Sequence, residues 1–468
     1  MVICPCKDGG TLNWQKYTAN SRRLSDQDLI LRGSGFRKFG TSKTSSSVIL
    51  PGEGWKSQKS LLSKLAMVAD PCSAYVHIPF CRRRCFYCDF PIAVLGHRGR
   101  GETSASVERY LTLLAAEISS TPASAQPLQT IFFGGGTPSL LAVAQVEGII
   151  AQLEQRFGLD PQVEISMEMD PGTFDLAHLE GYLGAGVNRI SLGVQALDDS
   201  LLESCGRYHR VAQVYEAVEW LHHVGMDNWS LDLISGLPHQ TLEGWQMGLE
   251  RAVDLGCHHL SLYDLSLEPQ TVFAKRYRPG LSPLPTEGQT AAMYRLAHNY
   301  LGNRGYYHYE VSNYAQPGHE CRHNLTYWHN QPYYGFGLGA TSYTQQQRVS
   351  RPRTQATYAD WVEEFQQRRG RHSDPPIPAL DHLLETLMLG LRLRQGIEGS
   401  QLRSLCDAAT WQSLYEILQP HIQRGWVVVQ GRSWADLEVL RLSAPEGFLF
   451  SNQVLASCFA LEELASPG

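Results

Sequence analysis

The chain has 468 residues and a formal net charge of −6, and its 43% hydrophobic and 18% charged residues are typical of a globular protein with two or three domains. No run of about 18 or more apolar residues occurs, so the sequence predicts no membrane-spanning helix. The eleven cysteines are scattered apart from one group of three, which excludes a disulfide framework and favours a reducing compartment.

Residues 1–70 differ in composition from the rest of the chain. They hold eleven Lys and Arg against five Asp and Glu, whereas the remainder carries a balance of −12. We expect a mostly disordered extension, interpreted as an organelle-targeting segment, a functional tail, or translated upstream sequence with Met67 as the natural start. The expected location is the cytoplasm, or an organelle matrix if this segment is a transit peptide. The acidic remainder predicts no nucleic-acid partner.

Three cysteines fall within eight residues, after a short apolar run. They are Cys81, Cys85 and Cys88. Thiolates at this spacing can occupy three corners of a [4Fe-4S] cluster, which leaves the fourth iron open to a small chelating molecule. The alternatives are a zinc site of these thiols with His77, or three unrelated buried thiols. The intervening arginines 82–84 suit a polyanionic cluster, or form a solvated basic turn.

From residue 74 onward, short β-like runs alternate with longer helical patterns, which predicts a parallel α/β architecture. The expected strands are residues 75–78, 129–133, 163–169, 188–194, 229–234 and 258–264. The expected helices are residues 104–119, 142–156, 175–185, 211–225, 242–255 and 287–304. Six such units are too few for a closed eight-stranded barrel, so we expect an open three-quarter barrel with ligands at the carboxyl ends of its strands.

Glycines and polar residues recur at those strand ends. Three glycines, 134–136, follow the second strand, where a ligand could approach the backbone, although a glycine triplet alone favours a simple tight turn. Glu168 and Gln195 end the third and fourth strands, Arg207 follows, and Asp232 lies in the fifth strand. Each alone could be structural, but their recurrence on successive strands indicates a binding site.

The spacing Cys-x-x-x-Cys-x-aromatic-Cys after a strand resembles the signature of the radical S-adenosylmethionine proteins. Residues 75–90 are similar to the branch that holds the oxygen-independent coproporphyrinogen III oxidases and the haem chaperones of the HemW type. The resemblance implies a (β/α)6 partial barrel, a [4Fe-4S] cluster on the three cysteines, and S-adenosylmethionine as the chelating molecule. It assigns that cofactor to Tyr75, Tyr87, Gly135, Gly136, Thr137, Glu168, Gln195, Arg207, Asp232 and Ser266.

A second motif lies between residues 316 and 354. His323-Asn-x-x-Tyr327-Trp328 resembles the motif that marks the haem chaperones. An imidazole can ligate haem iron, the aromatic rings can pack on a porphyrin, and Cys321 is a second candidate partner of the haem. The alternative is that His323 is a hydrogen-bonded loop residue and that the aromatic residues belong to the core.

Residues 355–468 change character. An apolar helix at 381–393, a helix near 410–424 and a β-like run at 426–430 suggest a small α+β, winged-helix-like domain. Because it has no basic recognition face, we interpret it as a lid or docking module. The expected division is therefore a barrel at 71–315, the haem motif with its Gly-rich segment at 316–354, and this C-terminal domain.

Two functions are open to such a chain. The oxidases of this branch carry a further Cys two residues beyond the third cluster ligand, where this chain has Phe90. This departure, with the His323 motif, favours a chaperone that binds haem and passes it to acceptor proteins over an oxidase that decarboxylates coproporphyrinogen III. The expected partners are haem or a porphyrinogen, haem-accepting proteins, some of them membrane haem proteins met peripherally, and a low-potential electron donor. The chain is expected to be a monomer or dimer.

Overall fold

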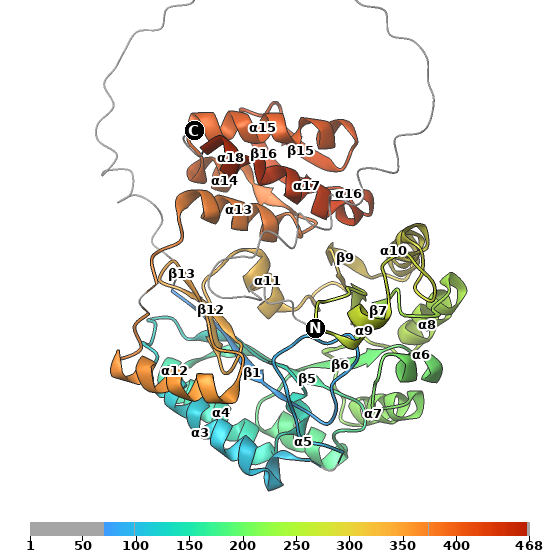
Figure 1. Ribbon diagram of the computed structural model, residues 1–468, viewed down its shortest axis with the longest axis vertical. Helices are drawn as coiled ribbons and strands as arrows, with labels where there is room; N and C mark the ends of the chain where they lie inside the picture. Colours follow the sequence, from blue (N-terminus) through green and yellow to red (C-terminus); the bar gives the residue numbers. More distant parts are fainter. Residues whose placement is uncertain (1–69, 98, 373, 466–468) are drawn as a thin grey trace, which may run out of the picture.

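A computed structural model describes residues 70–97, 99–372 and 374–465 (Figure 1). The expected extension, with the start at Met67, therefore lies outside the described residues, except for residue 70. Within the described ranges, no helix combines the length and the hydropathy that crossing a membrane requires.

A nine-stranded sheet in the order β11-β1-β4-β5-β6-β7-β8-β10-β9 organises the chain. Six of its strands are parallel neighbours in chain order, and they confirm the six predicted strands. They are β1 (Ser73–Ile78), β4 (Leu128–Gly135), β5 (Leu159–Met169), β6 (Arg189–Gln195), β7 (Trp229–Ser235) and β8 (His259–Asp264). The largest difference is at β5, which begins four residues earlier than the apolar pattern predicts.

Three short strands at the two ends of the sheet order were not predicted. β11 (Tyr334–Phe336) extends the parallel sheet beside β1, and β10 (Asn313–Ala315) pairs antiparallel with β8 and with β9 (Tyr307–Glu310). Runs of three or four residues are too short to show a period of two, so the sequence does not separate them from loops. A hairpin of β12 (Thr341–Thr344) and β13 (Gln347–Ser350) follows.

The predicted helices are present along the outer side of the sheet (Figure 1). They are α3 (Ala105–Ser120), α4 (Val143–Phe157), α5 (Leu176–Gly184), α7 (Val211–His223), α8 (Leu242–Asp254) and α10 (Glu287–Gly302). In α3, Val107, Tyr110, Leu114 and Ile118 are buried at helical spacing, which fixes the face that meets the sheet. Shorter elements are β2 (Phe80–Cys81), β3 (Ala93–Val94), η1 (Gly101–Thr103), η2 (Pro138–Leu140), α6 (Asp199–Ser204), α9 (Val272–Arg276) and α12 (Gln355–Gln367).

The two faces of the parallel sheet differ in polarity, because alternate residues of a strand point to opposite faces. One face is apolar and forms the main core with the helices; Ile131, Met167, Leu192, Leu231 and Leu260 belong to it. The register places polar residues side by side on the other face, as in Ser166 with Arg189 and Ser191 with Ser230. These residues are also buried. They are Ser73, Thr130, Glu164, Ser166, Arg189, Ser191, Ser230, Asp232, His259 and Ser261.

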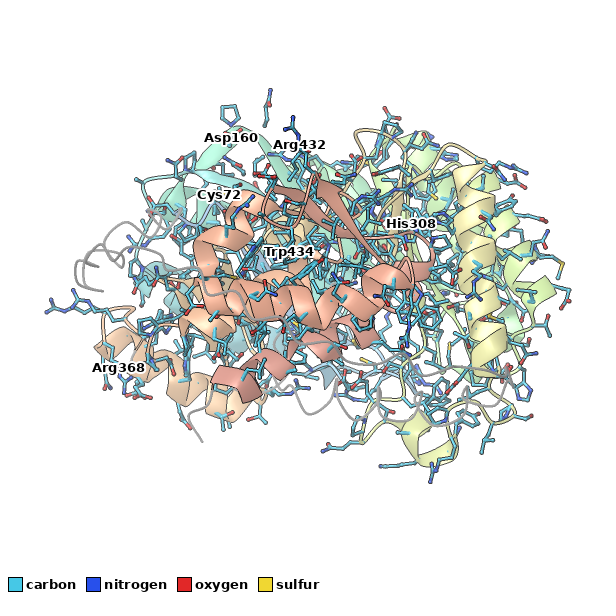
Figure 2. All side chains as sticks on the ribbon, turned by 90° about the horizontal axis from the view of Figure 1, so that it is seen from above. Cys72, Asp160, His308, Arg368, Arg432 and Trp434 are labelled. Atoms are coloured by element: carbon cyan, nitrogen blue, oxygen red, sulfur yellow. The ribbon has the colours of Figure 1, made fainter. Side chains whose placement is uncertain are left out.

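A second hydrophobic core forms around α11 (Arg322–Trp328) and the C-terminal elements. Those elements are α13 (Ala379–Gly390), β14 (Ile397–Glu398), α14 (Gly399–Leu405), α15 (Ala408–Gln423), β15 (Val427–Gly431), β16 (Leu437–Leu442), α16 (Glu446–Leu449), α17 (Ser451–Cys458) and α18 (Ala460–Ala465). Strands β14, β16 and β15 make a small antiparallel sheet, whose β15–β16 turn carries Arg432 and Trp434 (Figure 2). Helix α11 lies between this part and the main sheet, since it contacts both β4 and α13 (Figure 1).

The C-terminal part also covers the outer edge of the main sheet. Leu393 forms a bridge with Glu310 of β9, and the flanking backbone bonds join Val311 N–H to the carbonyl of Arg392 (3.1 Å) and Arg394 N–H to that of Tyr309 (2.9 Å). The side chains of Arg392 and Glu310 are 3.1 Å apart. Strand β9 is therefore paired on both sides.

A buried ion pair ties α3 to the segment after β13. Glu117 receives hydrogen bonds from Arg351 Nε (2.7 Å), Tyr358 O–H (2.6 Å) and Gly337 N–H (2.8 Å). Both charged side chains are almost fully buried, at 0% and 1% exposure. Because the carboxylate of Glu117 is buried, water cannot replace the charge of Arg351 if that side chain is removed.

We therefore expect Arg351→Met to lower the free energy of unfolding by about 3–5 kcal/mol, because the carboxylate of Glu117 is left buried without its cation. The control is Arg368→Met, which removes an exposed partner of Glu364 on α12 (Figure 2) and should cost less than about 1 kcal/mol. Urea unfolding of both variants measures the difference. Equal midpoints would show that the buried pair does not support the fold.

Candidate cluster and cofactor site

An open pocket of about 630 Å³ lies at the carboxyl ends of the parallel strands, where ligands were expected. It brings together most of the predicted site residues. These are Cys81, Cys85, Tyr87, Cys88, Gly135, Gly136, Thr137, Glu168, Gln195, Arg207 and Asp232. Arg83, Ile92, Met169, Asp170 and Gly193 complete the lining. No residue of the C-terminal part is among the lining residues that the structure describes.

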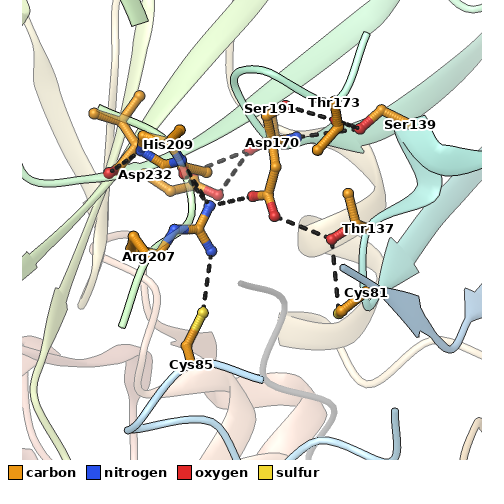
Figure 3. Close-up of polar contacts among 12 residues, drawn as sticks. Cys81, Cys85, Thr137, Ser139, Asp170, Thr173, Ser191, Arg207, His209 and Asp232 are labelled. Carbon is orange, nitrogen blue, oxygen red and sulfur yellow. Dashed lines mark hydrogen bonds and ion pairs between the residues drawn. The ribbon is translucent and has the colours of Figure 1, made fainter. Parts of the chain in front are cut away.

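The three thiols follow β1 on one loop and face this pocket. Thr137 Oγ1 lies 3.6 Å from Cys81 Sγ, and Arg207 Nη1 lies 3.5 Å from Cys85 Sγ (Figure 3). Burial raises the pKa of the Cys88 thiol to about 12, and burial with the nearby charge of Asp170 raises the pKa of Cys81 as well. A bound metal overcomes this by deprotonating a coordinating thiol.

The donor set fits a cluster better than a single ion. Among the described residues, no three His, Cys, Asp or Glu side chains converge closely enough to hold one metal ion. A [4Fe-4S] cluster gives each thiolate its own iron, so it needs sulfurs spaced around a pocket rather than converging on a point. His77, the fourth ligand of the zinc alternative, is directed to Tyr75 O–H (3.0 Å) and the carbonyl of Pro91 (3.1 Å) and does not line the pocket.

The backbone N–H groups of the glycine stretch at the end of β4 are already engaged. The N–H groups of Gly135, Gly136 and Thr137 already donate to Glu168 (3.0 Å) and to the carbonyls of Ile78 (2.8 Å) and Phe80 (2.7 Å). These three N–H groups are therefore occupied by partners within the protein. Glycine is needed at 135, where φ is +112° and a Cβ would lie 2.4 Å from the His77 ring.

The acidic residues at the strand ends are held by their neighbours. Besides its bond from Gly135, Glu168 faces the pocket, and Asp232 accepts from Ser191 O–H at 3.0 and 3.1 Å. Gln195 lines the same pocket with a φ of +69°, a conformation that is uncommon outside glycine and recurs at binding sites. The sheet therefore fixes three oxygen-bearing side chains around one space.

Two predicted residues lie outside the pocket lining. Tyr75 is buried behind it, with its ring stacked on Phe132 at 6.3 Å between centroids. Ser266 lies in the loop after β8, and its hydroxyl donates to Glu268 at 3.2 Å. Tyr87 does line the pocket, and its ring packs against Phe273.

Asp170 was missed by the sequence reasoning. It directly follows β5 and accepts from Arg207 and from Thr137 O–H (3.0 Å) in the pocket wall (Figure 3). The signal was present in Asp-Pro-Gly-Thr, residues 170–173, which is a turn signature at the carboxyl end of a strand.

The residues of the predicted haem motif lie elsewhere, at the amino ends of β1 and β4. His323 is fully buried, and its two ring nitrogens lie 2.7 Å from Thr130 Oγ1 and 2.8 Å from Tyr327 O–H. Its ring also stacks on Phe132 at 5.3 Å. Tyr327 and Trp328 belong to the second hydrophobic core. In this conformation both nitrogens of His323 are already engaged.

Cys321 precedes α11 and is fully buried too. Burial raises the pKa of its thiol to about 12, and its sulfur lies 3.9 Å from Glu164. Glu164 also accepts from the first backbone N–H groups of α11, those of Arg322 (3.3 Å) and His323 (3.2 Å). A carboxylate at a helix N-terminus is a stabilising cap, so Glu164 fastens α11 to the inner face of the sheet.

Comparisons with known proteins show which family and which fold the chain resembles. The model of the radical SAM superfamily matches residues 75–252. The chain is 44% identical to the heme chaperone HemW of Synechocystis, covering 84% of this chain and 98% of that protein. It is 41% identical to HemW of Lactococcus lactis, covering 59% and 71%. The solved structure of coproporphyrinogen III oxidase HemN from Escherichia coli is 22% identical, with a TM-score of 0.70 over 86% of this chain and 93% of that one.

Buried histidines make stability depend on pH. Burial lowers the pKa of His308 to about 3, and burial with the charge of Arg189 lowers that of His323 to about 3. Below about pH 6.5 the unfolded chain binds protons that the folded chain does not, so stability is full above pH 6.5 and falls toward pH 3.

We expect the free energy of unfolding of the metal-free chain, measured in urea, to be lower at pH 5.5 than at pH 7.5, by at most about 1.4 kcal/mol per pH unit for each such histidine. His323→Gln should show a shallower pH dependence, because one of the titrating groups is removed. A pH dependence as steep as that of the parent chain would contradict the inference that folding lowers the pKa of His323.

Proposed function

The chain belongs to the HemW haem chaperone family of the radical SAM superfamily, and on this basis we propose that it binds a [4Fe-4S] cluster and S-adenosylmethionine in the pocket, carries haem, and delivers it to haem-accepting proteins. The observation that carries the proposal is the pocket itself, in which three thiols of one loop face the ends of four parallel strands.

In this proposal Cys81, Cys85 and Cys88 hold three irons of the cluster. When bound, the cluster supplies an open iron for S-adenosylmethionine and a site for one electron. The remaining wall suits the polar groups of that cofactor. Arg207 Nη1 donates to its carboxylate, Glu168 and backbone carbonyls at the end of β4 accept from its ammonium, and Asp232 with Gln195 accepts from ribose hydroxyls.

The haem site is proposed at a coarser level. Ligation by His323, with Tyr327, Trp328 or Cys321 beside it, stays a prediction, and it requires the ring of His323 to leave Thr130 or Tyr327. The burial of all four side chains supports the alternative, in which the motif joins the sheet to the C-terminal core.

We also propose the finer organisation of the chain. It consists of a three-quarter barrel at 71–315, the motif and Gly-rich segment at 316–354, and a winged-helix-like domain at 355–468. The chain order α13-β14-α14-α15-β15-β16, with the three strands in one antiparallel sheet, supports the last assignment. A low-potential electron donor and haem acceptors are the proposed partners, and the cytoplasm, or an organelle matrix, is the proposed location.

The function is tested by anaerobic reconstitution with iron and sulfide, followed by paired assays. We expect a brown protein with about four irons and near-equal sulfide per chain, a haem Soret band on titration, and transfer of that haem to an apo-haem protein. Coproporphyrinogen turnover without haem binding would reverse the choice in favour of an oxidase. Zinc in place of iron and sulfide would overturn the cluster.

Replacing the three pocket cysteines together by Ala should reduce iron and sulfide to background, since each thiolate holds its own iron. Cys406→Ala, which changes a partly buried thiol of the C-terminal part, is the control and should keep the full content. Metal analysis and the visible spectrum measure both. A full content of iron and sulfide in the triple variant would show that the cluster is bound elsewhere in the chain.

The role of His323 is tested by His323→Ala. If the alternative holds, unfolding becomes easier by about 2–4 kcal/mol, because two buried hydrogen bonds and a ring stack are lost, and the Soret band persists. His329→Ala, at the exposed end of the same helix, is the control and should leave stability nearly unchanged. A lost Soret band with unchanged unfolding would instead identify His323 as the haem ligand.

A further inference from the structure

The turn after β5 is tightly fixed. Thr173 N–H donates to the carbonyl of Asp170 (3.1 Å), with Pro171 and Gly172 (φ +77°) between them, which is the arrangement of a type II turn. Asp170 N–H donates to Ser139 Oγ (3.2 Å), and Ser139 Oγ lies 2.6 Å from Thr173 Oγ1. The backbone that carries the Asp170 carboxylate therefore has little freedom.

The carboxylate lies over the backbone of β6 at Gly193. A Cβ built on Gly193 would lie 2.6 Å from Asp170 Oδ1 and 3.4 Å from Arg207 Nη2. Arg207 Nη2 donates both to Asp170 and to the carbonyl of Gly193 (2.6 Å). The glycine thus makes room for the Asp170–Arg207 pair.

This pair directs the other guanidinium nitrogen. With Nη2 held by Asp170 and Gly193, Nη1 of Arg207 reaches Cys85 Sγ at 3.5 Å (Figure 3). The Arg207 side chain is 8% exposed, so its orientation is set by these partners rather than by water. A planar guanidinium that is fixed at one nitrogen has its second nitrogen fixed as well.

The same turn contacts the cysteine loop at two further points. Thr137 Oγ1 lies between Asp170 Oδ2 (3.0 Å) and Cys81 Sγ (3.6 Å), and Arg82 Nη1 donates to the carbonyl of Gly172 (2.7 Å). Because a hydroxyl has a single proton, the carboxylate of Asp170, the stronger acceptor, orients Thr137. Residues 170–173 therefore support the cysteine loop at three points, through Arg207, Thr137 and Arg82.

We propose that Asp170 is a positioning residue of the cluster site. It holds Arg207 in the orientation that donates to Cys85 and that meets the carboxylate of S-adenosylmethionine, and it thereby tunes the electronic environment of the cluster and the affinity for the cofactor. Hydrogen bonds to cluster sulfurs and the partners that orient them set reduction potentials. This inference rests on the cluster and cofactor of the proposed function.

The test is Asp170→Asn in the reconstituted full chain. We expect the iron content of the parent, an altered electron paramagnetic resonance spectrum of the reduced cluster, a shifted midpoint potential, and an S-adenosylmethionine Kd raised about tenfold, measured by calorimetry. Asp407→Asn, which removes the same charge from the N-cap of α15, is the control and should match the parent.

The effect of Asp170 on the orientation of Arg207 is distinguished from the effect of its charge by repeating the substitution in a second variant. In Arg207→Lys, whose ammonium cannot make the two-sided contact, Asp170→Asn should add little further shift. The same shift in both backgrounds would show that Asp170 acts by its charge alone, and would overturn the proposal. An unchanged spectrum, potential and Kd in Asp170→Asn would also overturn it.

Gly193→Ala gives an independent route, because it keeps both charged residues but places a methyl group where their contact lies. We expect the same spectral and affinity changes as in Asp170→Asn, and parent behaviour would count against the proposal even if Asp170→Asn fails to fold. A parent chain that takes up no cluster would instead remove the proposed function, so the two failures are distinguishable.

Discussion

The structure depends on the burial of polar groups along the inner face of a parallel sheet. A parallel sheet has both faces covered by other parts of the protein. In this protein the inner face is lined with hydroxyl, carboxylate and basic side chains. Such groups are costly to withdraw from water unless each finds a partner, so they form chains such as Ser230 to Ser191 to Asp232. These series of hydrogen bonds lead to residues that line the pocket, such as Asp232. The side chains of the pocket wall are therefore held in place by the protein itself.

The same requirement explains where α11 lies. The carboxylate of Glu164 and the hydroxyl of Thr130 need donors or acceptors at the lower end of the inner face, and α11 provides its first N–H groups and His323. A ring stack from Tyr75 through Phe132 to His323 then joins the region behind the pocket to the C-terminal core. The His323 motif, which resembles the one that marks the haem chaperones, thus has a structural role that its spacing alone does not reveal.

The order of the main strands and helices was predictable, because each is long enough to show the periodic spacing of its apolar residues. The cysteine loop was predictable because three thiols at short spacing are chemically distinctive. Asp170 and the edge strands were not predictable in the same way. Asp170 gains its meaning from Thr137 and Arg207, which lie 33 and 37 residues away, and β10 pairs with β8 across α10. The sequence does not show that the N–H groups of Gly135 and Gly136 are engaged, because their acceptors come from other segments.

The bridge between Glu310 and Leu393 removes an exposed edge of the main sheet. A strand with one unpaired side presents a row of backbone donors and acceptors on which a strand of another chain can pair. Residues 392–394 occupy that side of β9. The C-terminal part therefore lowers the tendency of this edge to aggregate.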